Sequence, residues 1–198
     1  MPRCRGCALR VPTGVALCGE CIKQAPMTEA TLAATDYAHP WDHLIGRFKF
    51  NAALDLADMW ARCIEDAWRP SGLPRPDLLV PVPLSTERLR ERGYNQSWEI
   101  ARRLSRRIDC AADAHVLLRI RDTPHQLAFP IEQRAANVRG AFAVEPGRLK
   151  DLRGSRVAVV DDVLTTGATT AEIARVLRHA GAAAVQVWVI ARTPRPAE

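Results

Sequence analysis

One stretch near the carboxyl end of the sequence does most to limit which fold the chain can adopt. The apolar run at residues 157–160 passes directly into Asp161-Asp162, then into a polar loop that contains Gly167, and then into a segment with helical spacing. A strand that is apolar at every position is typical of a parallel sheet buried on both faces. The order strand, loop, helix is the repeating unit of such sheets. We therefore predict an α/β fold for this half of the chain.

Three more short apolar runs predict further strands, at residues 78–82, 116–120 and 185–191. Residues 94–108 and 170–180 carry apolar side chains at helical spacing. We expect Thr169 and Glu172 to form a capping box at the start of the second helix. Strands that alternate with helices predict a parallel sheet of about five strands, flanked by helices.

The composition fits a globular chain of one domain with a small addition. The 198 residues are 47% hydrophobic and 25% charged, which excludes a disordered, fibrous or coiled-coil protein. No apolar run approaches the roughly 18 to 20 residues of a membrane-spanning helix. The start, Met-Pro-Arg-Cys, lacks the apolar stretch of a secretory signal. We therefore expect a cytoplasmic protein without a membrane span.

A proline-rich stretch divides the chain. Residues 69–77 contain three prolines and a glycine, which is typical of a linker or loop. Before it, residues 41–68 carry apolar side chains at helical spacing, and we predict a helical hood or flank over residues 31–69. After it, residues 70–198 hold the predicted α/β domain, and residues 1–30 form a small module of their own.

The small module contains two Cys-x-x-Cys pairs, formed by Cys4, Cys7, Cys18 and Cys21. Two residues between thiolates let both reach one ion, and four thiolates complete the tetrahedral shell of a structural Zn²⁺. Two disulfides are the alternative, which a reducing cytosol disfavours. A redox-active pair is disfavoured because no strand–helix redox unit surrounds the cysteines. We predict a zinc knuckle that performs no chemistry, and we interpret Cys63 and Cys110 as packing thiols.

The loop after the two aspartates has the features of a phosphate site. Thr165, Thr166 and Thr169 offer hydroxyl groups, and Gly167 lets backbone amides close around an anion. The following helix directs its positive end to the same place. Two carboxylates would repel a bare anion, so their partner is better explained as a ribose diol or Mg²⁺. The alternative is an ordinary strand–helix turn in which one of these residues only caps the helix.

This motif resembles the phosphoribosyl pyrophosphate (PRPP) signature of type I phosphoribosyltransferases. Other stretches resemble the ComF family of competence-related, phosphoribosyltransferase-like proteins, namely residues 48–50, 80–96, 123–126 and 134–142. The two cysteine pairs fit the same family, and the resemblance covers nearly the whole chain. Residues 127–131 depart from the usual family sequence, and no segment resembles a part that recognises a nucleobase. The acceptor is therefore not identified.

The resemblance implies a type I phosphoribosyltransferase-like fold and assigns roles to single residues. It implies that Asp161 and Asp162 are the catalytic pair, in contact with the ribose hydroxyls or the ion. It also implies that the 5-phosphate of PRPP is held by residues of the loop, namely Thr165, Thr166, Gly167, Ala168 and Thr169.

In such enzymes the stretch after the strand at 78–83 cradles pyrophosphate, and arginine can bind phosphate oxygens with two hydrogen bonds. We assign Arg88 and Arg92 to this role and leave Arg90 as a bystander, on the assumption of an extended loop with alternating side chains. Asn95 and Gln96 could orient phosphate or acceptor.

A second set of cations lies in the stretch of residues 119–139 between two predicted strands. It includes Arg134 and Arg139. A long polar loop that is rich in cations predicts a lid, which would exclude water from a reacting pyrophosphate. The alternative is a basic connection with no role in the site.

Two functions follow from these observations. The first is an enzyme that binds PRPP with Mg²⁺ and transfers the phosphoribosyl group to an acceptor, releasing pyrophosphate. The alternative is a non-catalytic adaptor or sensor in DNA uptake or handling, which would bind a helicase-like partner through the zinc module. The net charge of +6 favours an anionic partner. The arginines within residues 102–107 could contact nucleic acid or form a solvated helix face, and direct DNA binding would show a steep salt dependence.

Overall fold

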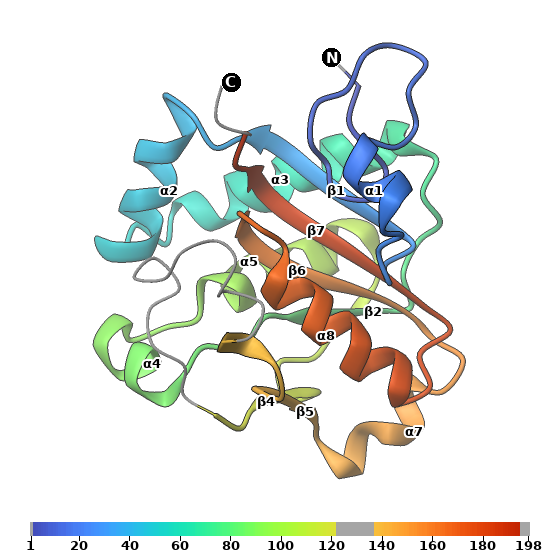
Figure 1. Ribbon diagram of the computed structural model, residues 1–198. Helices are drawn as coiled ribbons and strands as arrows, with labels where there is room; N and C mark the ends of the chain where they lie inside the picture. The colour runs from blue at the N-terminus through green and yellow to red at the C-terminus, as the bar shows by residue number, and fades with distance from the viewer. Residues whose placement is uncertain (1, 122–136, 195–198) are drawn as a thin grey trace.

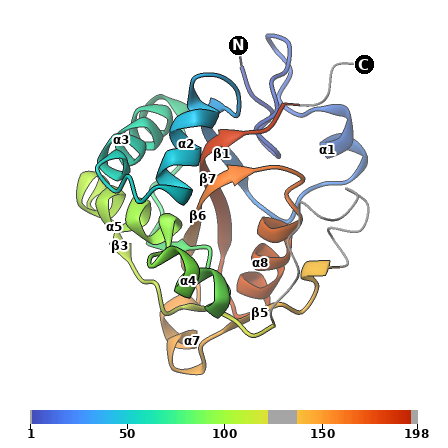
Figure 2. The same cartoon turned by 90° about the vertical axis from the view of Figure 1, so that its left-hand side faces the viewer.

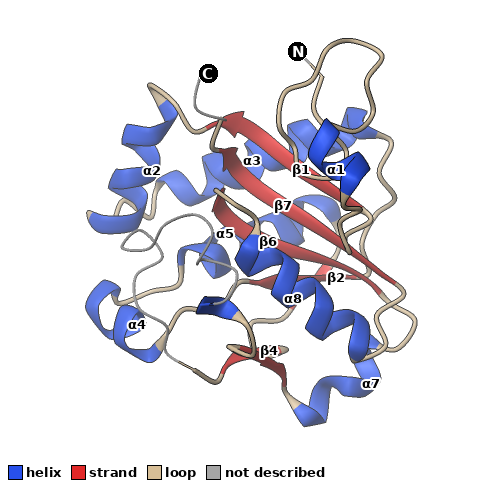
Figure 3. Ribbon diagram, in the orientation of Figure 1, coloured by secondary structure: helices blue, strands red, loops and turns tan. Residues whose placement is uncertain are grey.

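A five-stranded parallel sheet forms the centre of the molecule (Figures 1 and 3). The computed structural model describes residues 2–121 and 137–194. The strand order is β1-β7-β6-β2-β3, and every neighbouring pair is parallel. The strands are β1 (Ala30–Asp36), β2 (Leu78–Pro81), β3 (Ala111–Ala112), β6 (Arg156–Leu164) and β7 (Ala184–Arg192).

Helices cover both faces of this sheet. Figure 2 shows α2, α3 and α5 on one side of the strands and α8 on the other. Shorter helices lie in the connections of the sheet and in the cysteine module. The bounds of the longer helices are α2 (Trp41–Phe50), α3 (Leu56–Trp68), α5 (Gln96–Ile108) and α8 (Ala168–His179), and the short ones of the connections are α4 (Thr86–Arg92), α7 (Leu149–Leu152), η1 (Arg69–Ser71) and η4 (Pro146–Arg148).

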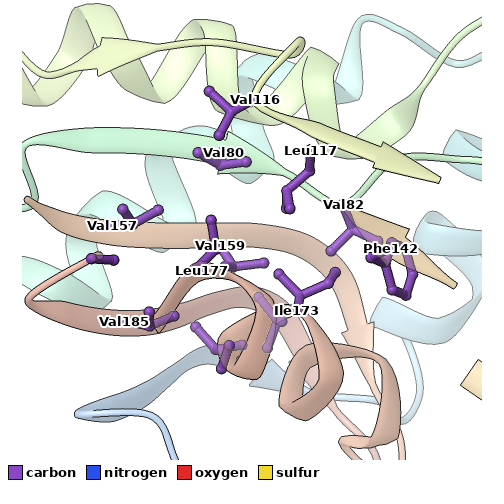
Figure 4. Packing of buried hydrophobic residues seen from close by; sticks show 14 of the residues in the cluster. Val80, Val82, Val116, Leu117, Phe142, Val157, Val159, Ile173, Leu177 and Val185 are labelled. Atoms are coloured by element: carbon purple, nitrogen blue, oxygen red, sulfur yellow. The ribbon is translucent and has the colours of Figure 1, made fainter. Parts of the chain in front are cut away.

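The central strand β6 explains why its sequence is apolar throughout. Successive side chains of a strand point to opposite faces. Val157 and Val159 pack with Ile173 of α8 (Figure 4), whereas Ala158 and Val160 pack with the helices of the other face. Both faces of the strand are therefore buried, as the sequence predicts for a parallel sheet. The predicted α/β class is confirmed.

One predicted strand lies outside the parallel sheet. The apolar run at residues 116–120 forms β4 (Leu117–Arg119), which pairs antiparallel with β5 (Phe142–Val144) in a separate two-stranded sheet. Leu118 is 39% and Ile120 63% exposed, so this strand buries only one of its faces. The prediction that this run joins the main sheet was wrong, because a run of four or five apolar residues does not reveal whether both faces are covered.

The edge strand β1 comes from the segment that the sequence predicts to be helical. Its residues pair with β7, with Ala33 opposite Val189 and Asp36 opposite Arg192. The prediction of helix from residue 31 was therefore wrong up to Asp36, and helix begins at Trp41. The division of the chain at residues 30 and 69 stays a prediction.

The cysteine module lies beside β1 (Figure 1). It contains one short helix, α1 (Gly19–Lys23), and an antiparallel bridge between Arg3 and Arg10. Both of these arginines form ion pairs with Asp36 at the end of β1. The Thr31 hydroxyl donates a buried hydrogen bond of 2.8 Å to the Gly6 carbonyl. The module is thus fixed to the edge of the sheet. Among the described helices, none has the length and apolar character needed to cross a membrane.

Candidate functional site

A cleft of about 290 Å³ opens at the carboxyl edge of the parallel sheet. Ligands of open α/β sheets bind at this edge. Tyr37 follows β1 and Val82 follows β2, while Asp161 and Asp162 lie near the end of β6, and all four line the cleft. The remaining walls come from α2, α4, the first residue of α5, β4 and the first turn of α8. Segments far apart in the sequence therefore meet in one place.

Asp161 lines this cleft, and its surroundings disfavour the charged form of its carboxyl group. Its Oδ1 atom accepts hydrogen bonds from the Ser97 hydroxyl at 3.0 Å and from the backbone N–H of Asp162 at 2.9 Å. Burial and the carboxylate of Asp162 nevertheless raise the pKa of Asp161 to about 7. Like charges at short range and low hydration both favour the neutral form. Near neutral pH this group can therefore either accept or release a proton.

Asp162 is almost completely buried, with 3% of its surface exposed. Its Oδ1 atom accepts the Val163 N–H at 2.6 Å and lies 2.9 Å from Lys49 Nζ. The other oxygen, Oδ2, is buried and has no hydrogen-bond partner among the described residues. A buried carboxylate oxygen without a partner is costly. This oxygen is therefore a candidate contact for a hydroxyl group or a cation of a ligand.

Lys49 is a site residue that the sequence analysis did not select. It lies on α2 beside the buried Phe48, and its ammonium group reaches across to Asp162. Burial alone would lower the pKa of Lys49, but the Asp162 carboxylate outweighs this effect and the pKa is raised. The group is therefore cationic and partly compensates the acidic pair. Its place in the Phe48–Phe50 stretch was the only signal in the sequence.

The loop from Thr165 to Thr169 leads directly into α8. Gly167 precedes the helix with φ +85°, a left-handed conformation that favours glycine. Because glycine has no side chain, it leaves the positive end of a twelve-residue helix open toward the cleft. Thr166, Gly167, Ala168 and both flanking threonines line the cleft. This end of the cleft can bind an anion.

The predicted capping box at this helix does not form. The helix begins at Ala168, so Thr169 lies inside its first turn. The Glu172 carboxylate instead accepts the Gly140 N–H at 2.8 Å and pairs with Arg175. The prediction was wrong because the turn at Gly167 starts the helix earlier than the threonine pattern suggests.

The arginines after β2 lie on a helix and not in an extended loop. On α4, Arg88 and Arg92 are four residues apart, which places both on one face. Both line the cleft, whereas Arg90 is exposed and is not part of its lining. An extended segment would have turned all three side chains to the same side, so the assumption behind their assignment was wrong. The guanidinium of Arg92 lies 5.3 Å from the ring centroid of Phe50 and donates to Gln96 Oε1.

The other predicted ligand residues separate into two groups. Gln96 lines the cleft, but Asn95 uses its side chain to cap α5 and to donate to the Val82 carbonyl at 3.0 Å. Arg139 is exposed, and its carbonyl accepts a hydrogen bond from Arg121. Arg134 and the family-like stretch at 123–126 lie outside the described residues. Arg119, on β4, lines the cleft and stacks on Phe142 at 5.6 Å.

The four cysteines of the first module form a second site. Their Sγ atoms all lie within 4.8 Å of one another. Thiolates around a tetrahedral Zn²⁺ are separated by about 3.8 Å, given Zn–S bonds of about 2.3 Å. Burial alone would raise the pKa of Cys4, but backbone N–H groups led by that of Cys18 lower it to about 7. A Cβ atom at Gly6 would lie 2.8 Å from Cys21 Sγ, so only glycine fits there. The donor set therefore fits zinc, and Cys63 and Cys110 lie apart from it.

Comparison with known proteins agrees with this architecture. The family model described as "Phosphoribosyl transferase domain" matches residues 95–198. The chain is 37% identical to the DNA utilization protein YhgH of Escherichia coli K12, over 96% of this chain and 84% of that protein. It is 34% identical to competence protein F of Haemophilus influenzae, over 96% and 85% respectively.

A solved structure of a Bacillus subtilis glutamine PRPP amidotransferase aligns with a TM-score of 0.42 and 22% identity, over 68% of this chain and 25% of that chain. The two sequence relatives are aligned over more than four-fifths of their own length. The chain therefore belongs to the competence protein F family and carries a phosphoribosyl transferase domain.

Proposed function

We propose that the cleft binds PRPP together with Mg²⁺ and transfers its phosphoribosyl group to an acceptor. One observation carries this proposal: an acidic pair lies in the same cleft as the amino end of α8, and its buried member, Asp162, has an oxygen, Oδ2, without a partner among the described residues. The first feature suits the hydroxyls of a sugar, and the second suits a phosphate. PRPP presents both groups on one small molecule. The phosphoribosyl transferase domain of the family supports the same ligand.

In this proposal each wall of the cleft has one task. Residues 165–169 hold the 5-phosphate through backbone N–H groups and hydroxyls. Asp161 and Asp162 contact the ribose hydroxyls or the ion, and Lys49 holds Asp162 in place through their ion pair. Arg88 and Arg92, on the facing helix, bind the pyrophosphate. Gln96 orients Arg92 through their hydrogen bond.

Mg²⁺ fits the oxygen donors of this cleft, because carboxylates and phosphates are its usual ligands. Asp161, Asp162 and the pyrophosphate would hold it, and it would neutralise negative charge on the leaving group when bound. The chain's own residues position the ribose and stabilise the departing pyrophosphate. In the transfer, the bond between ribose C1 and the pyrophosphate oxygen breaks, and a bond forms between C1 and the acceptor. The pyrophosphate leaves with the bonding electron pair.

The direct test is calorimetric titration of the zinc-loaded protein with PRPP, with and without Mg²⁺. We expect binding that requires Mg²⁺ and a loss of at least about 100-fold in affinity when Asp161 and Asp162 are both replaced by Asn, because two charge-assisted hydrogen bonds are removed. Asp113→Asn, a carboxylate outside the cleft lining that pairs with Arg148, is the matched control. Unchanged affinity in the double variant would refute the proposal.

A second candidate function is an adaptor in DNA uptake, and the surface of the cysteine module favours it. Val15, Ile22 and Met27 are 39%, 70% and 52% exposed, which makes the module a candidate docking surface for a helicase-like protein partner. The names of the relatives, competence protein F and DNA utilization protein, agree with this role. Ile22→Asp with Met27→Asp should abolish partner capture and leave PRPP affinity unchanged. Equal loss of both would contradict a separate docking surface.

Direct nucleic-acid binding by α5 has less support. Arg102 and Arg103 both pair with Glu99, and Arg107 lies 3.5 Å from Glu65 on α3. Three of the four arginines within residues 102–107 are therefore engaged with carboxylates of the protein itself. A steep fall of DNA affinity with salt would restore this hypothesis.

A further inference from the structure

Arg192 stands where the cysteine module, the sheet and the loop of residues 165–169 meet. It is the last residue of β7 and is only 8% exposed. Its backbone pairs with Asp36 of β1 on one side and with Leu164 of β6 on the other. Strand β7 lies between those two strands (Figure 1). The side chain therefore projects from the middle of the carboxyl edge, beside the cleft.

The guanidinium group joins two segments that are far apart in the sequence. Its Nε atom donates to the carbonyl of Cys7 at 2.8 Å. Its Nη1 atom donates to the carbonyls of Leu164 at 3.0 Å and of Thr165. A further bond of 2.8 Å goes to the carbonyl of Thr193. One side chain thus holds a metal-ligand residue of the first module and the first residue of the loop at the amino end of α8.

Arginine is well suited to this connection. Its donors form a rigid planar fork, so bonds made on one edge fix the direction of bonds on the other. A lysine carries one ammonium group on a flexible stem and cannot span the same distance with fixed geometry. The Cys7 side is itself rigid, because the next residue, Ala8, is fully buried with φ +58°. Movement of the Cys7 carbonyl would therefore move the guanidinium and the loop with it.

We propose that Arg192 is a positioning residue that couples the four-cysteine cluster to the loop of residues 165–169. When the cluster holds zinc, the Cys7 carbonyl is fixed and Arg192 holds the Leu164 and Thr165 carbonyls in place. These two carbonyls belong to the start of the segment that lines the cleft up to Thr169. Without the metal, the knuckle loosens and the loop loses this constraint. The consequence for PRPP rests on the proposed function, but the coupling between metal and loop does not.

Hydrogen–deuterium exchange of the whole chain tests the coupling directly. In the wild type, removal of zinc by a chelator should speed exchange of the amides at residues 165–170 roughly tenfold, the effect of losing one to two hydrogen bonds on local opening. Arg192→Lys, loaded with zinc, should show the same fast exchange and little further change on chelation. Amides of the core strand at residues 157–160 report global unfolding and should stay protected.

Thr31→Val is the matched control. It removes the hydrogen bond from the Thr31 hydroxyl to Gly6, so it loosens the docking of the module, but it does not touch the loop. Its zinc-loaded form should exchange at residues 165–170 as the wild type does. Faster exchange there in Thr31→Val would mean that any loosening of the module is enough, and it would overturn the specific role of Arg192.

Two further results would also overturn the proposal. The first is an exchange rate at residues 165–170 of the wild type that does not change when zinc is removed. The second is an exchange rate at these residues in zinc-loaded Arg192→Lys that equals the rate in zinc-loaded wild type. The second comparison stands even if the chelated protein unfolds.

PRPP titration separates the coupling proposal from the proposed function. If zinc-loaded wild type does not bind PRPP while the exchange results hold, the proposed function fails and the coupling remains. If PRPP binds, it must raise the zinc affinity by the same factor by which zinc raises PRPP affinity, because linkage between binding equilibria is reciprocal.

Discussion

The cysteine cluster and the acidic pair are both groups of side chains that repel one another when ionised. They differ in how completely the protein arranges partners for these charges. In the cluster, four sulfur atoms lie close enough to fill all four coordination positions of a tetrahedral metal ion. In the cleft, Lys49 and Ser97 compensate only part of the pair, and Asp162 Oδ2 stays without a described partner. We call the cysteine cluster the closed site, because a metal held by four thiolates has no free coordination position and can only stabilise structure. We call the acidic pair the open site, because it keeps an oxygen that a ligand can bind, at a cost in stability.

The largest expected effect comes from opening the closed site. Cys21→Ser should prevent stable zinc binding and unfold the module, because structural zinc contributes roughly 10 kcal/mol of binding free energy to such small folds. Metal analysis after dialysis, together with thermal unfolding, measures this. Cys63→Ser, a half-buried cysteine outside the cluster, should retain one zinc per chain. Full zinc content in Cys21→Ser would show that the cluster is not a four-thiolate site.

The raised pKa of Asp161 in the open site should make the free energy of unfolding depend on pH. Because the pKa of Asp161 is raised from 3.8 to about 7, the folded protein keeps a proton that the unfolded chain has released. This group therefore lowers the free energy of unfolding as pH rises from about 4 to 7, by at most roughly 1.4 kcal/mol per pH unit. Asp161→Asn removes that part of the slope. Urea denaturation at several pH values tests it, and equal slopes in the two proteins would refute the assignment.

Removing the countercharge should also destabilise the open site. Lys49→Met leaves the buried Asp162 carboxylate without its cation, and we expect a loss of about 2 to 3 kcal/mol at pH 8, reduced from a fully buried pair because Lys49 is 23% exposed. Lys49→Arg should lose less, since it keeps the charge. Lys150→Met, an exposed lysine on α7, should change stability by less than about 0.5 kcal/mol. An equal effect of the two methionine variants would argue against the ion pair.

The smallest effect concerns the cations across the cleft. Arg88→Ala and Arg92→Ala should each weaken PRPP binding roughly tenfold, about the value of one charge-assisted hydrogen bond. Arg90→Ala, on the same helix but outside the cleft lining, is the control and should bind as the wild type does. Calorimetry measures all three. If Arg90→Ala weakens binding as much as the others, the effect is one of net charge and not of position.

The same contrast explains what the sequence predicted. The four clustered cysteines all lie in the first 21 residues, and the acidic pair, the loop and α8 follow one another directly, so local spacing was enough to find both. Lys49 lies more than a hundred positions before Asp162, and only the packing of α2 brings them together. Pairwise contacts of this kind leave no pattern in a single sequence.

Two elements were missed for reasons of local chemistry. Strand β1 is rich in alanine, with little of the β-branched or aromatic character that marks a strand. It is extended because β7 pairs with it. The helix α4 is short and highly charged, so its apolar spacing is too weak to predict it. Only the residue that caps it is a typical signal, because serine favours this position. The Ser85 hydroxyl accepts the Arg88 N–H at 3.3 Å.

The position of β7 between β1 and β6 has a consequence for biosynthesis. In the sheet, β7 is flanked on both sides by strands that precede it in the sequence. During translation, β1 and β6 are therefore synthesised before β7, the strand that lies between them in the sheet. Until β7 emerges, both carry exposed backbone edges that can pair with the wrong partner. The cysteine knuckle, whose contacts are local, can form early, whereas the sheet must close after translation has passed residue 192.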